Sequence, residues 1–234
     1  MEQIVLKNVT KTYNNKCVLE DISQTFMCGH SYAFSGHNGY GKSTLLRLIS
    51  GITRPEKGKV VYSKKFSFSF VPEKFRPTAL SGRIFLERMG EIDGLTKTQL
   101  SSRINQFAES FYMSDMLDIP MKKMSKGTLQ KIGIIQALLK EPDILLLDEP
   151  LSGQDMASQK VFSNRINELR DKGVTVFMAC HESWLVDTSA DTVFTIENRQ
   201  LVPRLEIQKR IYKLLLEKTE SAAVREDMKL CNGV

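Results

Sequence analysis

Residues 36–44 follow the pattern GxxxxGK[ST], in which Lys42 and Ser43 are the chemically distinctive members. A short strand-like run precedes the pattern, and apolar residues at helical spacing follow it. In that setting the glycines let backbone N–H groups surround phosphate oxygens, the start of the helix adds the positive end of its dipole, and Lys42 adds a full charge. The pattern predicts a nucleotide phosphate site rather than the alternative, a simple glycine-rich turn.

The predicted phosphate-binding residues fill this segment without a gap. Ser43 is also a predicted ligand of Mg²⁺, because its hydroxyl follows the phosphate-binding lysine directly. We interpret His37 and Tyr40 as spacers whose backbone contributes more than their side chains. The full set is Gly36, His37, Asn38, Gly39, Tyr40, Gly41, Lys42, Ser43 and Thr44.

Two carboxylates, Asp148 and Glu149, stand at the end of the apolar run 144–147. Such a run is typical of a strand buried on both faces of a parallel sheet, and ligand sites lie at the carboxyl ends of such strands. Asp148 is predicted to hold Mg²⁺, and Glu149 to act as general base or polariser of the water that attacks the γ-phosphate. Alone this pattern is common; with the phosphate loop it predicts the second half of a nucleotide-hydrolysis site.

Residues 124–130 run into a predicted helix, with Ser125 as its N-cap. A hydroxyl, a small Gly127 and a helix N-terminus together suit an anion. The segment resembles the LSGGQ signature of the ATP-binding cassette (ABC) ATPases. In that family the signature of one subunit binds the γ-phosphate of ATP held by another, so the resemblance implies a dimer, homomeric or heteromeric, joined by ATP through Ser125 and Gly127. The alternative is a capped helix and nothing more.

Further motifs of the family follow in the expected order from about Leu6 to Ile196. Tyr13 resembles the aromatic residue that stacks on adenine, although a turn tyrosine packed on the sheet is the alternative. Residues 152–155 resemble the D-loop, which implies that Asp155 contacts the partner's ATP site. His181 resembles the switch histidine that contacts the γ-phosphate, so the catalytic set implied is Lys42, Glu149 and His181.

The chain departs from the family pattern at several of these motifs. Glu73 stands where the Q-loop has glutamine, and is interpreted as a metal-shell or coupling residue. Lys126 replaces a glycine of the signature, and Gln154 replaces the leucine of the D-loop. Both Pro72-Glu73 and Ser125-Lys126-Gly127 resemble small bacterial exporter ATPases, which favours export as the direction of transport.

The predicted strands and helices that must position these residues indicate an α/β fold. We predict a P-loop NTPase core with a mostly parallel sheet, an antiparallel β entry region, and a helical signature subdomain inserted at about residues 74–141. This ABC ATPase domain is predicted to span 1–203. Residues 204–234 are predicted to form an amphipathic helix and a loose tail; the helix either packs on the core or touches a partner or a membrane surface.

Composition excludes several classes of protein. With 234 residues, 41% hydrophobic and 26% charged, the chain is neither collagen-like, coiled coil nor disordered. No apolar stretch approaches the roughly 18 residues that cross a bilayer. The net charge, 33 − 27 = +6, is too mild to indicate nucleic acid as a partner. Four scattered cysteines without a CxxC motif predict free thiols and no metal centre.

The leading hypothesis is therefore the ATP-binding and ATP-hydrolysing subunit of an ABC transporter, with ATP and Mg²⁺ as cofactors. Its expected partners are a second nucleotide-binding domain and a separate integral membrane permease, so the expected location is cytoplasmic, peripheral on the inner face of the cell membrane. One alternative is a soluble ABC ATPase that acts on an assembly scaffold. A regulatory module that binds nucleotide without turnover is disfavoured by Glu149.

Overall fold

The computed structural model describes residues 2–37 and 39–204. The chain divides between Val202 and Pro203, and the description below concerns the first unit. The helix and tail predicted for 204–234 fall outside the described residues from position 205 onward. The domain limits therefore stay a prediction.

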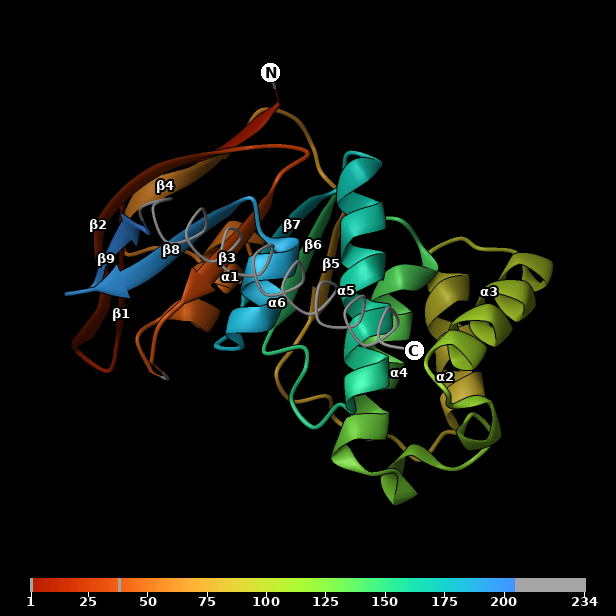
Figure 1. Ribbon diagram of the computed structural model, residues 1–234. Coiled ribbons are helices and arrows are strands. Elements are labelled where there is room, and N and C mark those ends of the chain that lie inside the picture. Colours follow the sequence, from red (N-terminus) through yellow and green to blue (C-terminus); the bar gives the residue numbers. More distant parts are fainter. Residues whose placement is uncertain (1, 38, 205–234) are drawn as a thin grey trace, which may run out of the picture. The chain divides into compact units, whose positions relative to one another are not determined.

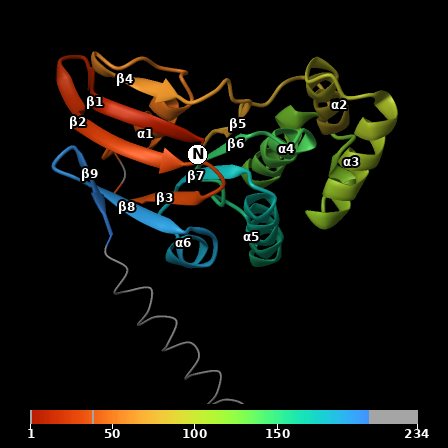
Figure 2. The same ribbon diagram turned by 90° about the horizontal axis from the view of Figure 1, so that it is seen from above.

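An antiparallel sheet opens the chain (Figures 1 and 2). Its strands are β1 (Gln3–Tyr13), β2 (Lys16–Met27) and β4 (Lys57–Tyr62), in the order β2-β1-β4. Asn14 and Asn15 join β1 to β2 at φ values of 47° and 61°. Asparagine tolerates this left-handed backbone, which matches the twist of a two-residue hairpin, so the predicted antiparallel entry region is confirmed.

The second sheet is the core of the molecule and has the order β5-β6-β7-β3-β8-β9. Every pairing from β5 to β8 is parallel. All residues of the apolar strands β6 and β7 are buried, as expected of strands covered on both faces. The predicted α/β fold with a mostly parallel sheet is confirmed. The strands are β3 (Ser31–Ser35), β5 (Phe68–Val71), β6 (Ile144–Asp148), β7 (Thr175–Ala179), β8 (Thr192–Glu197) and β9 (Gln200–Pro203).

Two apolar clusters cover the two faces of this sheet. On one face α1 (Lys42–Ile49) packs between the parallel and antiparallel sheets, around the edge-to-face rings of Phe26 and Phe177. The other face is covered by α4 (Lys126–Leu139), α5 (Met156–Asp171) and α6 (Ser183–Ser189), whose apolar residues share one cluster. Because β6 contributes to both clusters, its carboxyl end is held from both sides.

The inserted helical segment consists of α2 (Gly82–Ile92), α3 (Lys97–Ser110), the short turns η1 (Ser114–Met116) and η2 (Met121–Lys123), and α4. In α2, Leu86 and Gly90 are buried and Phe85 packs against the core cluster, whereas Ile84 is 44% exposed. A Cβ on Gly90 would lie 2.1 Å from Leu100 Cδ2, so the glycine lets α3 approach closely. Among the described residues, no helix is long and apolar enough to cross a membrane.

Gly58 offers a test of the antiparallel sheet. It has φ +76°, and a Cβ there would lie 2.2 Å from the carbonyl oxygens of Lys7 and Asn8, where the β1–β4 register shifts. Gly94 has a similar φ of +84° in open space and serves as the control. Gly94→Ala should lower Tm by about 2–4 °C through its backbone alone. Gly58→Ala should lower Tm at least twice as far in calorimetry, and equal shifts would contradict the backbone contact.

Candidate functional site

The phosphate loop joins β3 to α1 and folds back around the side chain of Lys42. Gly41 is the N-cap of α1 at φ 100°, and a Cβ there would lie 2.9 Å from Val18 Cγ1, so only glycine fits. Lys42 Nζ donates to the carbonyl oxygen of Gly36 at 2.6 Å. The Lys42 side chain is only 5% exposed, so its charge is held at a fixed place beneath the loop.

The carboxyl end of β6 meets the start of α1 through a side-chain hydrogen bond. Ser43 Oγ donates to Asp148 Oδ1 at 2.8 Å, which brings together the two residues predicted to hold Mg²⁺. Burial raises the pKa of the Asp148 carboxyl, and the hydrogen bond from Ser43 opposes that rise in part. Hydroxyl and carboxylate oxygens are the ligand types that Mg²⁺ takes in proteins, so the donor set fits the ion.

Glu149 follows at a left-handed backbone position, φ 47°, which is rare outside glycine and asparagine. Its N–H donates to the carbonyl oxygen of Ala179 at 2.8 Å, so the neighbouring strand β7 holds this conformation. Glu149 Oε1 lies 3.5 Å from Lys42 Nζ. Strained backbone of this kind concentrates at functional sites, and here it turns a carboxylate toward the phosphate loop.

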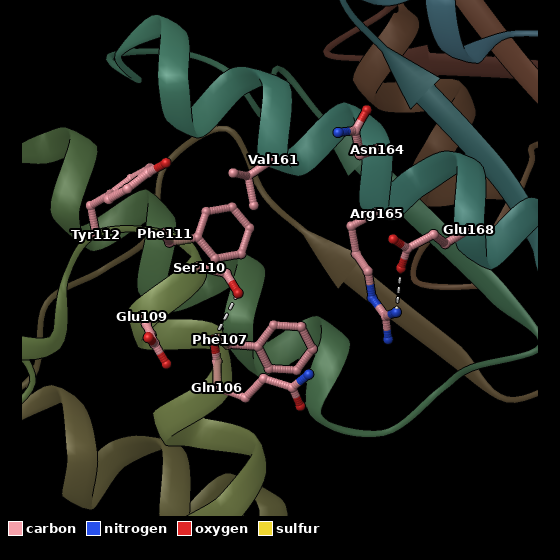
Figure 3. Close-up of a pocket in the computed structure, with 10 residues that line it drawn as sticks. All are labelled: Gln106, Phe107, Glu109, Ser110, Phe111, Tyr112, Val161, Asn164, Arg165 and Glu168. Carbon is pink, nitrogen blue, oxygen red and sulfur yellow. Dashed lines mark hydrogen bonds and ion pairs between the residues drawn. The ribbon is translucent and has the colours of Figure 1, made fainter.

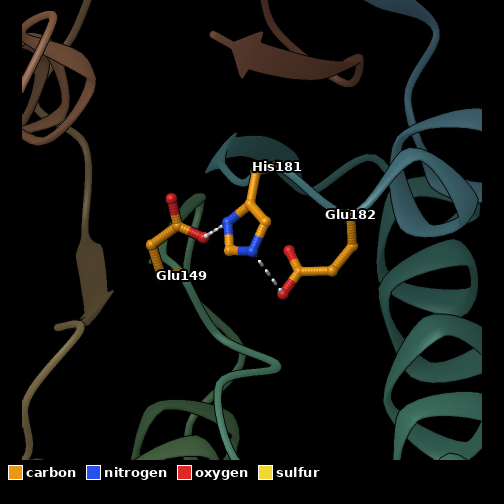
Figure 4. Close-up of side chains that lie close together, drawn as sticks. All are labelled: Glu149, His181 and Glu182. Carbon is orange, nitrogen blue, oxygen red and sulfur yellow. Dashed lines mark hydrogen bonds and ion pairs between the residues drawn. The ribbon is translucent and has the colours of Figure 1, made fainter. Parts of the chain in front are cut away.

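The imidazole of His181 lies between two carboxylates (Figure 4). Nδ1 is 2.8 Å from Glu149 Oε2, and Nε2 is 3.8 Å from Glu182 Oε1. The two ring nitrogens therefore face different carboxylates. A single metal ion accepts one nitrogen from a histidine, so a ring that faces a different carboxylate with each nitrogen, and hydrogen-bonds to Glu149, does not present these three residues as one metal centre.

One cavity of about 480 Å³ gathers these groups. The residues that line it come from the phosphate loop and the start of α1, from the loops that follow β5, β6 and β7 at the carboxyl edge of the parallel sheet, and from β2 of the antiparallel sheet. That edge is where α/β sheets bind ligands. The lining residues are Val18, Gly39, Gly41, Lys42, Ser43, Thr44, Glu73, Glu149, Ser152 and His181.

Some residues predicted for the nucleotide do not line this cavity. Tyr13 is 41% exposed at the end of β1, with Lys11 Nζ 4.9 Å from its ring centroid. The rings of His37 and Tyr40 contact each other edge to face, with centroids 5.6 Å apart. Asn38 is outside the described residues. Their roles stay predictions.

Ser125, Gly127 and Asp155 do not line the cavity either. Ser125 is the N-cap of α4, and its Oγ accepts from the Thr128 N–H at 3.2 Å. Asp155 is the N-cap of α5, where the N–H of Ser158 and the neighbouring Lys131 hold the pKa of its carboxyl well below the usual range. Within one chain, the predicted anion-binding residues of the signature therefore do not share the cavity of Lys42 and Glu149.

Sequence reasoning missed two residues at the site, Val18 and Glu182, and gave no role of its own to a third, Ser152 of the predicted D-loop. Val18 fills the space beside Gly41, Ser152 lines the cavity two residues before Gln154, and Glu182 flanks the His181 ring. Glu182 could have been predicted from the sequence, since it directly follows His181. Nothing in the apolar spacing of β2 singles out Val18.

A second cavity, of about 420 Å³, lies between α3 and α5 (Figure 3). Phe107 and Phe111 form part of its apolar wall, and on the α5 side Arg165 Nη1 donates to Glu168 Oε2 at 2.8 Å. The guanidinium carbon of Arg165 lies 5.6 Å from the Phe107 ring centroid. The two cavities share no lining residue, so this one is separate from the nucleotide site.

Comparison with known proteins gives consistent matches. The family model described as ABC transporter matches residues 19–152. The zinc import ATP-binding protein ZnuC of Hydrogenovibrio crunogenus is 33% identical over 201 residues, covering 82% of this chain and 78% of that protein. The O-antigen export system ATP-binding protein RfbB of Klebsiella pneumoniae is 34% identical over 184 residues, covering 78% and 74%. A solved ATP-binding subunit of an ABC transporter has the same fold, with TM-score 0.80, 24% identity and coverage of 90% and 93%.

The buried carboxyl of Asp148 should cost the free protein stability. The pKa of Asp148 is raised in the folded protein. The loss of folding stability is therefore absent below the ordinary aspartate pKa of about 4, and it grows as the pH rises through the pKa of the folded state. Asp148→Asn should therefore raise Tm at pH 8 and lose that gain toward pH 4. Thermal unfolding across this range tests the sign. The exposed Asp187→Asn is the control, and a gain that is independent of pH would refute the assignment.

Proposed function

Because the chain belongs to the ABC transporter family and is one of its ATP-hydrolysing subunits, we propose that it closes against a second nucleotide-binding domain around two ATP molecules and so drives a separate membrane permease. One observation carries the proposal. Lys42, Glu149 and His181 share a cavity, whereas Ser125 and Gly127 of the same chain lie outside it. The start of α4 suits an anion, and the proposal assigns to it the phosphate held by another chain.

Phosphate binding falls to the loop from Gly36 to Thr44. Its backbone N–H groups, the start of α1 and the Lys42 ammonium all favour the β- and γ-phosphate oxygens. Tyr13 is proposed to stack on the adenine from the edge of the antiparallel sheet, which its 41% exposure permits. His37, Asn38 and Tyr40 are proposed to contribute through their backbone.

Mg²⁺ is proposed to sit beside Ser43 and Asp148, with Glu73 in reach from the loop after β5. These oxygens are at hand because Ser43 already bonds Asp148 and Glu73 lines the same cavity. When bound, the ion would neutralise charge on the β- and γ-phosphates. A glutamate at position 73 adds a negative charge that a glutamine there would not bring.

Hydrolysis is proposed to depend on Glu149 and His181. Glu149 would accept a proton from the attacking water, and its strained backbone fixes the carboxylate in place before substrate arrives. His181, bonded to Glu149 Oε2, would hold that carboxylate and contact the γ-phosphate. Asp155 is proposed to contact the partner's site from the N-cap of α5.

The permease is proposed to dock on the helical segment. Leu80 and Ile84 are large apolar residues that are 41% and 44% exposed there, whereas Phe75 and Phe85 pack against each other. Exposed apolar side chains grouped in this way suit a protein partner. Attachment to a permease would place the chain at the inner face of the cell membrane.

Glu149→Gln should reduce ATP turnover at least 100-fold and leave nucleotide binding intact, because the binding groups stay and only the base is lost. With ATP and Mg²⁺, this variant should accumulate as a dimer in size-exclusion chromatography with light scattering. Lys42→Ala is the matched control and should lose both nucleotide binding and dimer. A Glu149→Gln variant that keeps wild-type turnover would refute the assigned base.

Expressing Glu149→Gln in native cells tests the partner. Purified from gently solubilised membranes with ATP, it should bring a stoichiometric multi-span permease with it. Recovery with soluble partners alone would instead favour the scaffold ATPase.

The direction of transport is proposed to be export. The sequences around Pro72-Glu73 and Ser125-Lys126-Gly127 resemble exporter ATPases, while similar proteins include both an importer and an exporter by name. With the co-purified permease in liposomes and ATP added on the side of this subunit, an exporter should move substrate away from that side. Movement toward that side would overturn the export assignment and leave the ATPase assignment standing.

A further inference from the structure

Two segments far apart in sequence touch beside the nucleotide cavity: the start of α4 and the turn of residues 149–155 that follows β6, here called the post-β6 turn. A Cβ on Gly127 would lie 2.3 Å from the carbonyl oxygen of Gly153, so the two backbones are in direct contact. Only a residue without a side chain allows this approach at position 127. The contact joins the helical segment to the turn that carries Glu149.

Three side-chain interactions cross the same contact. Lys126 Nζ donates to Ser152 Oγ at 2.7 Å, and Gln154 Nε2 donates to the carbonyl oxygen of Gly127 at 2.9 Å. One turn further along α4, Lys131 Nζ lies 3.1 Å from Asp155 Oδ2. The bonds run in both directions, since Lys126 reaches into the turn and Gln154 reaches back to α4.

Backbone hydrogen bonds within the post-β6 turn connect its residues to Glu149. The N–H of Ser152 donates to the carbonyl oxygen of Glu149 at 3.3 Å, and the N–H of Gln154 donates to that of Leu151 at 3.0 Å. Ser152 also lines the nucleotide cavity. A displacement of the Lys126 end of α4 therefore passes through Ser152 to the backbone that holds Glu149 at φ 47°.

We propose that Lys126 and Gln154 are positioning residues for ATP hydrolysis, which hold the post-β6 turn against α4 and so place Glu149 for reaction. This inference rests on the proposed role of Glu149. The Gln154 bond is part-buried, whereas the Lys126 bond is exposed, and an exposed pair adds little stability. Lys126 and Gln154 together contribute to the geometry of the post-β6 turn. A displacement of about 1 Å there can lower the rate of hydrolysis up to a hundredfold.

The test measures steady-state ATPase kinetics of the full chain with Mg²⁺. Lys126→Met removes the ammonium at similar length, and Gln154→Leu removes the amide donor. Each should lower kcat about tenfold and leave KM for ATP within about twofold, since only the placement of Glu149 changes. Lys126→Arg keeps a donor and should retain kcat. Lys122→Met, an exposed lysine four residues upstream, is the matched control.

The double variant gives a second readout. Because both bonds hold the same contact, Lys126→Met with Gln154→Leu should lower kcat less than the product of the two single effects. Unchanged kcat in both single variants, or a rise in KM equal to the fall in kcat/KM, would overturn the inference. The second result would mean that Lys126 contacts nucleotide directly. An inactive wild-type chain would instead contradict the proposed function itself.

Discussion

Three charged side chains buried at one edge of an apolar sheet are the constraint on which the rest of the structure depends. Lys42, Asp148 and Glu149 are each at most 9% exposed, and buried charge is costly unless it is paired. Lys42 lies between a carbonyl oxygen and Glu149, and Asp148 accepts from Ser43. The apolar strands β6 and β7, covered on both faces, hold these groups close enough to offset one another.

That arrangement is incomplete within one chain. The cavity is lined by Lys42, by other residues of the phosphate loop and by Glu149, whereas Ser125 and Gly127 of the predicted signature do not line it. A polyphosphate with four negative charges would attract both sets of groups. The proposed dimerisation through the ligand would follow from this separation of the two sets of residues.

The sequence predicts much of this fold because its signals are local. The hairpin asparagines, the uninterrupted apolar runs of β6 and β7, and the serine caps of the helices each specify their own element. The placement of Lys42, Ser43 and Glu149 in one cavity follows from the order strand, loop, helix and from parallel pairing. In contrast, the close approach of α3 to α2 could not be read from apolar spacing, since it depends on Gly90, which admits Leu100 from α3.

Contacts between distant segments explain what the sequence left out at the site. In the sequence, Lys126 and Gln154 could be recognised only as departures from the family pattern. Lys126 replaces a small residue, and Gln154 replaces an apolar one. In the structure each side chain bonds into the other's segment, 26 and 27 positions away along the chain. Two substitutions that weaken a motif when judged separately therefore form one contact when judged together. The start of α4 and the post-β6 turn must therefore be considered together, because neither sequence motif alone shows the contact.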